Sequence, residues 1–336
     1  MAENELKLPA DESEQLIIKS QDQTNPKYGT KPEERNIKQL FEYGVINLDK
    51  VSGPTSHEVV SWVKKVLGIE KVGHGGTLDP NVTGILPVAL DRGTRVLSAL
   101  LSAGKEYICV MNLHSDIPKE KIERIFNQFT GKIYQRPPLK SSVRRRLRIR
   151  EIYYLELLEV QDRHVLFRIG CEAGTYIRKF CFDIGEALCS GAHMLELRRT
   201  RVGPFREDKS LVTLHDIKDA FTIYQKENDE RYLKKIVSPM EKMVAHMPKI
   251  YVRDSAVDAL CHGADLAAAG ICNIDARIKP QMQVALMTLK GELIGFGRAK
   301  KDALSIFKAN SGILVESDKV FMKRGTYPGW NQEKET

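Results

Sequence analysis

Residues 73–87 read Gly73-His74-Gly75-Gly76-Thr77-Leu78-Asp79-Pro80-Asn81-Val82-Thr83-Gly84-Ile85-Leu86-Pro87, and we expect the rest of the chain to be organised around them. Four glycines and two prolines surround one carboxylate, that of Asp79, so the sequence predicts that Asp79 stands on a shaped turn. Taken alone, the letters also fit an ordinary Asp-Pro surface turn. The apolar run from Ile85 to Leu90, however, predicts a buried strand next to the turn. We therefore expect a desolvated Asp79, and such carboxylates are candidates for chemistry.

Two common functions of glycine-rich or acidic loops do not fit this stretch. A phosphate-binding loop of the nucleotide-hydrolase kind needs Gly-Lys-Ser/Thr at the start of a helix, and residues 73–87 contain no lysine. Glycoside hydrolysis by the usual route needs two carboxylates on either side of one bond. The stretch offers only Asp79, so its catalytic partners would not be acids.

The composition bounds the size of the protein and the kind of partner it binds. A chain of 336 residues predicts about two domains, and 42% hydrophobic residues are enough for a core. There are 52 Lys and Arg against 44 Asp and Glu, which gives a formal charge of +8. Because the basic surplus is clustered, it indicates an anionic partner.

Cysteine spacing and hydropathy indicate the compartment. The six cysteines include no C-x-x-C pair and no histidine at zinc-finger spacing, so we expect buried, reduced thiols rather than disulfides or a metal site. No apolar stretch approaches a membrane span, and the polar, acidic N-terminus is unlike a signal peptide. We expect a soluble, cytoplasmic protein.

Hydrophobic periodicity predicts mixed helices and strands after a polar N-terminal strap. Thr55 and Glu58 have the spacing of a capping box for a helix that ends at Gly68. The stretch from Asp229 to Val244 is charged and has the composition of a linker. Further helices are predicted at 94–102, 118–130, 173–188 and 255–260, and strands at 44–50, 106–113, 152–160, 165–171, 194–202, 250–252, 284–289, 293–298 and 312–315.

Two groups of basic residues call for anionic partners. Arg178 falls in the first turn of the helix predicted after Gly174, where the helix dipole disfavours a cation, so either it has an anionic partner or it is an ordinary exposed surface arginine. Residues 140–150 hold six basic residues and no acid, next to Tyr153 and Tyr154. A solvated charged face is the ordinary explanation for such a run. Its density favours contact with RNA or DNA phosphates, through Lys140, Arg144, Arg145, Arg146 and Arg148.

The motifs taken together resemble the tRNA pseudouridine synthase B family and, within it, the archaeal dyskerin-like branch that supplies the catalytic subunit of box H/ACA guide-RNA particles. The first motif is residues 44–56, the second is 75–84, the third is 176–185 and the fourth is 197–205. Val51 and Phe180 depart from the usual proline and leucine, which leaves the catalytic positions unaffected.

The resemblance implies an α+β architecture, with a catalytic domain around a mixed, mainly antiparallel sheet and a small β-rich PUA domain. The domain limits predicted from sequence are an N-terminal strap at 1–38, a catalytic domain at 39–247, a PUA domain at 248–325 and a tail at 326–336.

The resemblance also implies roles for individual residues. Asp79 would be the catalytic nucleophile, Arg178 its buried partner, and Tyr107 would lie against the target base. Tyr176, Leu197 and His74 would form the substrate pocket, and residues 134–150 would be an RNA-gripping loop. Isomerising uridine to pseudouridine needs no redox step, so no cofactor and no metal are expected.

Two classes of function remain distinct on the sequence. The first is an RNA pseudouridine synthase acting on tRNA, at the TΨC-loop uridine, or on rRNA, with a box H/ACA guide RNA and small partner proteins or without them. The second is a non-catalytic RNA-binding scaffold of such a particle. Retention of Asp79, Tyr107 and Arg178 together favours the enzyme, because a scaffold needs none of them.

Overall fold

The computed structural model describes residues 6–137, 144 and 146–329 of the chain. These residues form two compact units, and each has its own sheet and its own apolar core. Each unit is assembled from separated segments of sequence. The first unit takes residues up to 11, then 46–89 and 97–236, and the second takes 12–45, 90–96 and the residues from 237 onward.

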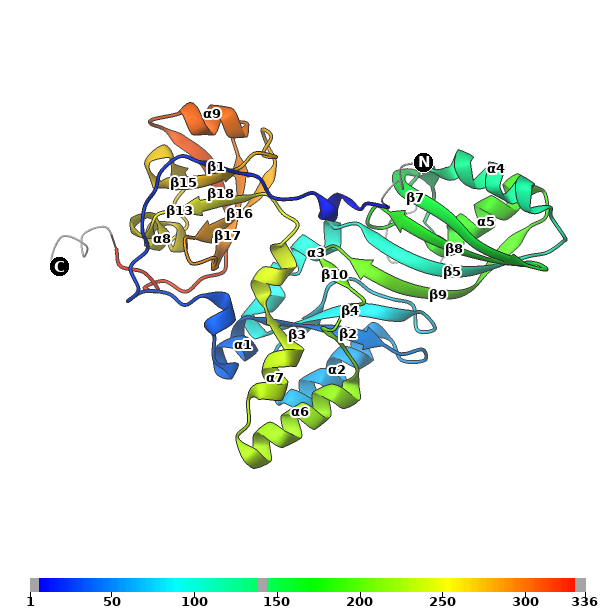
Figure 1. Cartoon of the computed structure of the whole chain (residues 1–336), viewed down its shortest axis with the longest axis horizontal. Coiled ribbons are helices and arrows are strands. Elements are labelled where there is room, and N and C mark those ends of the chain that lie inside the picture. The colour runs from blue at the N-terminus through cyan, green and yellow to red at the C-terminus, as the bar shows by residue number, and fades with distance from the viewer. Residues whose placement is uncertain (1–5, 138–143, 145, 330–336) are drawn as a thin grey trace. The chain divides into compact units, whose positions relative to one another are not determined.

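The first unit is built on a mixed sheet whose neighbours are mainly antiparallel, in the order β11-β2-β4-β9-β5-β8-β7-β6 (Figure 1). The pairs β11–β2 and β4–β9 are parallel, whereas the pairs from β9 to β6 are antiparallel. The predicted fold class is therefore confirmed. The strands are β2 (Gly44–Lys50), β3 (Val72–His74), β4 (Thr83–Leu90), β5 (Lys105–Leu113), β6 (Gly131–Gln135), β7 (Arg148–Gln161), β8 (His164–Cys171), β9 (Ala192–Val202), β10 (Phe205–Arg206) and β11 (Leu211–Val212).

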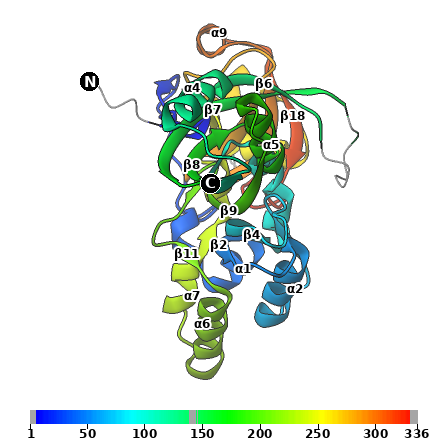
Figure 2. The same cartoon turned by 90° about the vertical axis from the view of Figure 1, so that its right-hand side faces the viewer.

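Helices α4 and α5 cover one face of the part of this sheet that contains β5, β7, β8 and β9, as Figures 1 and 2 show. Alternate residues of β5, among them Cys109 and Met111, are buried against Phe126 of α4 and Phe180 and Ile184 of α5. This core fixes the start of α5 against the sheet. The helices of the first unit are α2 (Ser56–Leu67), α3 (Ser98–Ser102), α4 (Lys119–Phe129), α5 (Ile177–Leu188), α6 (Leu214–Glu227) and α7 (Arg231–Ile236).

Helix boundaries agree with the prediction where the sequence contains recognisable capping residues. Thr55 and Glu58 form the predicted capping box, and α2 ends at Gly68 with φ +64°. The helix predicted at 94–102 is instead a 3₁₀ turn, η3 (Asp91–Val96), followed by the short α3. The stretch predicted as linker-like contains α7, in which Leu233 and Ile236 are buried.

The second unit is a seven-stranded sheet in the order β1-β15-β13-β16-β17-β18-β14. Among the described residues of this sheet, only β13 and β16 pair in parallel, and the other neighbouring strands pair antiparallel. Its elements are β1 (Leu16–Ile18), α1 (Ile37–Tyr43), β12 (Val237–Pro239), β13 (Lys249–Val252), α8 (Asp254–Cys261), β14 (Leu266–Ala267), β15 (Ile271–Asp275), β16 (Gln283–Thr288), β17 (Leu293–Ala299), α9 (Ala303–Lys308) and β18 (Ile313–Val320), with the 3₁₀ turns η2 (Pro32–Glu34), η4 (Met240–Val244) and η5 (Ala268–Gly270).

Residues 12–38 of the predicted N-terminal strap belong to this second unit, whereas residues 6–11 belong to the first. Strand β1 lies along β15, with Ile17 packed on the core while Leu16 and Ile18 remain exposed. The ammonium of Lys19 donates to three carbonyls at the end of α9 (Ile306 at 3.1 Å, Phe307 at 2.7 Å and Ala309 at 2.5 Å). These contacts attach the strap to the sheet without a large apolar surface.

Two further expectations concern cysteines and membranes. All six cysteines are free and five are buried as predicted, but Cys189 is exposed, because it caps the C-terminus of α5 with φ +56°. In the described ranges, no helix is both long enough and apolar enough to cross a membrane.

Candidate active site

The loop that carries Asp79 is fixed on both sides of the aspartate. Lys50 is only 1% exposed, and its ammonium donates to the carbonyls of Val51, Pro80 and Val82 at 2.8–2.9 Å. The hydroxyl oxygen of Ser56 accepts from the Leu78 amide at 2.9 Å. Buried backbone groups need partners of this kind, so two side chains from β2 and α2 set the shape of the loop.

Gly84 lets strand β9 approach the loop closely. Its φ is +100°, and a Cβ at this position would lie 2.2 Å from the carbonyl oxygen of Arg199. No other residue fits there. The close approach places the Arg199 guanidinium behind the loop, where it donates to the carbonyls of Ile85 at 2.8 Å and Gly76 at 3.0 Å.

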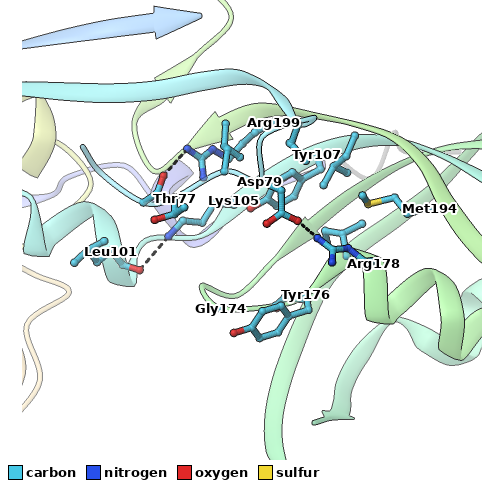
Figure 3. A pocket seen from close by; sticks show the side chains of 16 residues that line it. Thr77, Asp79, Leu101, Lys105, Tyr107, Gly174, Tyr176, Arg178, Met194 and Arg199 are labelled. Carbon is cyan, nitrogen blue, oxygen red and sulfur yellow. Dashed lines mark hydrogen bonds and ion pairs between the residues drawn. The ribbon is translucent and has the colours of Figure 1, made fainter. Parts of the chain in front are cut away.

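The start of α5 is held by a buried amide. The Gln135 side chain accepts from the Tyr176 amide at 3.0 Å and donates to the Tyr176 carbonyl at 3.2 Å. Tyr176 is extended and forms the N-cap, so α5 starts at Ile177, four residues later than the sequence predicted. Arg178 then lies in the first helical turn and forms an ion pair with Asp79 (Figure 3). The anionic partner expected for Arg178 is thus Asp79.

This ion pair is half exposed. The side chains of Arg178 and Asp79 are 55% and 54% exposed. The expectation of a desolvated carboxylate in a buried pair is wrong for this structure, because the turn at Asp79-Pro80 projects from the sheet, while the apolar residues after it turn inward along β4.

Asp79 and Arg178 lie at a cavity of about 500 Å³, and most of the predicted pocket residues line it. Tyr107, Tyr176 and Leu197 are among them. Figure 3 shows Tyr107 close to Asp79, and Tyr176 beside the start of α5. The size is that of an ordinary small-ligand site. The lining consists of Gly76, Thr77, Leu78, Asp79, Val82, Leu101, Lys105, Tyr107, Gly174, Thr175, Tyr176, Ile177, Arg178, Met194, Leu197 and Arg199.

His74 is not in this lining. Its ring stands edge-on to that of His57, with 5.1 Å between centroids, and its Nδ1 accepts from the Gly76 amide at 3.4 Å. Burial, followed by the charge of His57, lowers the pKa of His74. In this structure His74 supports the loop from behind.

Two charged lining residues, Lys105 and Arg199, are among those that the predicted site residues did not include. Lys105 is 6% exposed and donates to the carbonyls of Leu100 at 3.0 Å, Leu101 at 3.0 Å and Ala103 at 2.7 Å. Burial lowers its pKa to about 8. A signal was present, because Lys105 precedes Tyr107 by two residues on a strand and so shares its face.

Burial also perturbs the tyrosine and the arginine of this wall. It raises the pKa of Tyr107, and the positive charge of Arg199 partly opposes that rise. Burial lowers the pKa of Arg199, which is 1% exposed. The back wall of the cavity is thus a low-dielectric region that contains charge.

The basic segment is only partly described. Arg144 and Arg146 are exposed, and Arg148 begins β7 half-buried, whereas Lys140 and Arg145 lie outside the described residues. No group of three or more His, Cys, Asp or Glu side chains in the described residues is arranged to hold a metal ion.

Comparison with protein families assigns almost the whole chain. Residues 64–177 match the TruB family pseudouridylate synthase N-terminal domain, and 178–245 match the tRNA pseudouridylate synthase B C-terminal domain. A probable tRNA pseudouridine synthase B from Pyrococcus abyssi is 54% identical over 98% of this chain and 99% of its own. The chain belongs to the TruB family of pseudouridine synthases. The expected family resemblance is confirmed.

Other matches extend the TruB assignment to both ends of the chain. Residues 3–60 match the DKCLD (NUC011) domain and 248–321 the PUA domain. A probable tRNA pseudouridine synthase B from Methanopyrus kandleri is 53% identical over 96% of this chain and 95% of its own. A chain in the crystal structure of a Cbf5-Nop10-Gar1 complex has a TM-score of 0.93 at 54% identity, covering 96% of this chain and 98% of that chain.

Proposed function

We propose that this TruB-family enzyme is the catalytic subunit of a box H/ACA guide-RNA particle and converts uridine to pseudouridine in tRNA, at the TΨC-loop uridine, or in rRNA. The similar chain in the Cbf5-Nop10-Gar1 complex supports this proposal. So does a chain 51% identical with a TM-score of 0.91, which belongs to an H/ACA RNP bound to a substrate RNA and covers 96% of this chain and 99% of that chain. Its partners are then substrate RNA, a guide RNA and small partner proteins, in the cytoplasm.

The Asp79–Arg178 pair at the cavity is the observation that carries the catalytic assignment. The guanidinium of Arg178 holds the carboxylate of Asp79 in one orientation. Asp79 can then act as a nucleophile on the sugar, as a nucleophile on the base, or as a base toward a sugar proton. We assign it the role of nucleophile and Arg178 that of its orienting partner.

The remaining lining residues suit an unstacked base. RNA is read through flipped or single-stranded bases that stack on aromatic rings, and Tyr107 and Tyr176 offer two rings in the lining. Leu197 adds an apolar contact from β9. Extruding the base costs a few kcal/mol, and we propose that phosphate contacts from residues 140–150 offset that cost. The predicted limits, 39–247 for catalysis and 248–325 for RNA binding, are part of this proposal.

The decisive experiment replaces Asp79 by asparagine, which keeps the size of the side chain and removes its charge. We expect Asp79→Asn to form no pseudouridine while RNA affinity stays within about 1 kcal/mol, a factor of about five. The assay is single-turnover conversion of a labelled uridine RNA, followed by nucleoside analysis. Product at a tenth of the parental rate or more would refute the assignment and leave the scaffold alternative open.

Asp49 provides a matched control. Its carboxylate forms a bidentate pair with Arg198 at 2.9–3.0 Å, also partly exposed, in the same unit but outside the cavity lining. Asp49→Asn should therefore keep pseudouridine formation. If both variants lose activity together, disturbance of the sheet rather than loss of the nucleophile explains the result.

Guide dependence needs a separate measurement. Purification of the tagged chain from its own cells, followed by sequencing of the bound RNA, should recover stable guide RNA with small proteins if the particle assignment holds. Full activity of the isolated chain on bare tRNA, with no co-purified guide, would instead identify a stand-alone enzyme.

A further inference from the structure

The cavity lining carries more positive than negative charge. Among the described residues that line it, Lys105, Arg178 and Arg199 are cationic, and Asp79 is the only carboxylate. Arg178 is paired with Asp79. Within the described part of the chain, Lys105 and Arg199 have no carboxylate partner and donate to backbone carbonyls.

Both cations are almost completely removed from water. Lys105 is 6% exposed and Arg199 is 1% exposed. Burial, followed by the positive charge of Arg199, lowers the pKa of Lys105. Burying a charge without an opposite charge is costly. If Lys105 only capped α3 and Arg199 only held the loop of Asp79, uncharged hydrogen-bond donors could do the same without the cost of a buried charge.

The chemistry of a pseudouridine synthase supplies a transient anion at this position. When the N1–C1′ bond breaks, its electron pair stays on N1 and the uracil ring departs as an anion. C5 then bonds to C1′, the C5 proton leaves and N1 gains a proton, so the product is an isomer of the substrate. If a carboxylate instead adds to C6 before the N1–C1′ bond breaks, the negative charge lies on O4. The uracil ring is therefore anionic by this route as well.

Resting on the proposed function, we propose that Lys105 and Arg199 stabilise the uracil ring as an anion while it is detached from the sugar. When the carboxylate of Asp79 bonds to C1′ as the N1–C1′ bond breaks, negative charge passes from Asp79 to the ring. The charge returns to Asp79 when C5 bonds to C1′ and the Asp79–C1′ bond breaks. Arg178 is paired with Asp79, where the negative charge begins, and the two buried cations line the same cavity. Preorganised charges in a water-poor site are the usual large contribution to catalysis.

The test compares two RNA substrates whose detached rings differ in how strongly the enzyme must stabilise their negative charge. A fluorine at C5 withdraws electrons, so a 5-fluorouridine ring is a better-stabilised anion than a uridine ring. Lys105→Met keeps the length of the side chain and removes its charge. We expect single-turnover consumption of the uridine RNA to slow by about 100-fold, and consumption of the matched 5-fluorouridine RNA to slow several-fold less. The readout is loss of the labelled starting nucleotide.

Equal slowing on both substrates would overturn the proposal, because a residue that only holds the pocket in shape affects both alike. If Lys105→Met does not fold, Lys105→Gln takes its place, since it is neutral but still donates hydrogen bonds to the carbonyls. The same unequal slowing is expected for it. Failure of the wild-type protein to convert uridine at all would refute the proposed function rather than this inference.

Lys19 gives the matched control. Its ammonium caps three carbonyls at the end of α9, as that of Lys105 does at the end of α3, but Lys19 belongs to the second unit and does not line the cavity. Lys19→Met should leave both rates and their ratio at the wild-type values. A changed ratio in this variant would show that loss of a helix cap, and not loss of charge at the cavity, alters the discrimination, and would overturn the proposal.

Discussion

Arg178→Ala should separate stability from activity. The side chains of Arg178 and Asp79 are both about half exposed. Exposed ion pairs contribute about 0.2–1 kcal/mol to folding. We therefore expect the free energy of unfolding to change by less than about 1 kcal/mol. Activity should fall by about 100-fold, since loss of orientation at a reacting group has effects of that size.

The assay combines urea unfolding, followed by circular dichroism, with single-turnover kinetics on one RNA. Arg35 offers an internal comparison within the second unit, because its bidentate pair with Glu241, at 2.8 and 2.9 Å, is buried. Removing one partner of a buried pair costs about 3–5 kcal/mol, so Arg35→Ala should destabilise strongly. A comparable loss in Arg178→Ala, or an unchanged rate, would refute the reasoning.

Three further results are expected. Lys50→Met should cost at least about 3 kcal/mol of stability, measured by urea unfolding, because it leaves three carbonyls without their charged donor; a loss under 1 kcal/mol would contradict this. Neutralising the basic segment should lower the log-log salt slope of RNA binding by roughly 0.7 per lost contact, and an unchanged slope would exclude phosphate contact; the arginines to replace are Arg144, Arg145, Arg146 and Arg148. Lys105 has a pKa of about 8 in the folded protein, against an ordinary value of 10.5. Between these two pH values the unfolded state binds more protons than the folded state, so the free energy of unfolding rises with pH by roughly 3 kcal/mol. Lys105→Met should lack this rise, which pH-dependent unfolding of both proteins would show.

Much of the first unit could be predicted because its signals are local. The capping box at Thr55, the buried run after Gly84 and the helix that carries Arg178 each depend on residues close in sequence. The pairing of Arg178 with Asp79 was expected from the family resemblance, whereas the first-turn position of Arg178 alone also allowed an exposed surface arginine.

The parts that could not be predicted depend on distant backbone. Lysine and arginine are ordinarily exposed. The strand position of Lys105 indicates that it shares a face with Tyr107, but no sequence signal shows that carbonyls of α3, β4 and the central loop surround Lys105 and Arg199. The exposure of Asp79 depends on how the turn leaves the sheet, which sequence does not record. Helix α7 was missed because the charged composition of residues 229–244 predicts a linker, whereas burial of Leu233 and Ile236 stabilises a helix there.

The segmented second unit has a consequence for synthesis of the chain. The chain enters this unit three times, at residues 12–45, at 90–96 and from 237 onward. During translation β1 is made about 250 residues before its partner β15, so at ordinary elongation rates of about 5–20 residues per second it waits for many seconds. In that interval the first unit has all of its segments and can fold, while Leu16–Ile18 remains an unpaired apolar edge. Lysine and glutamate residues around this short strand limit its association with other chains before β15 emerges.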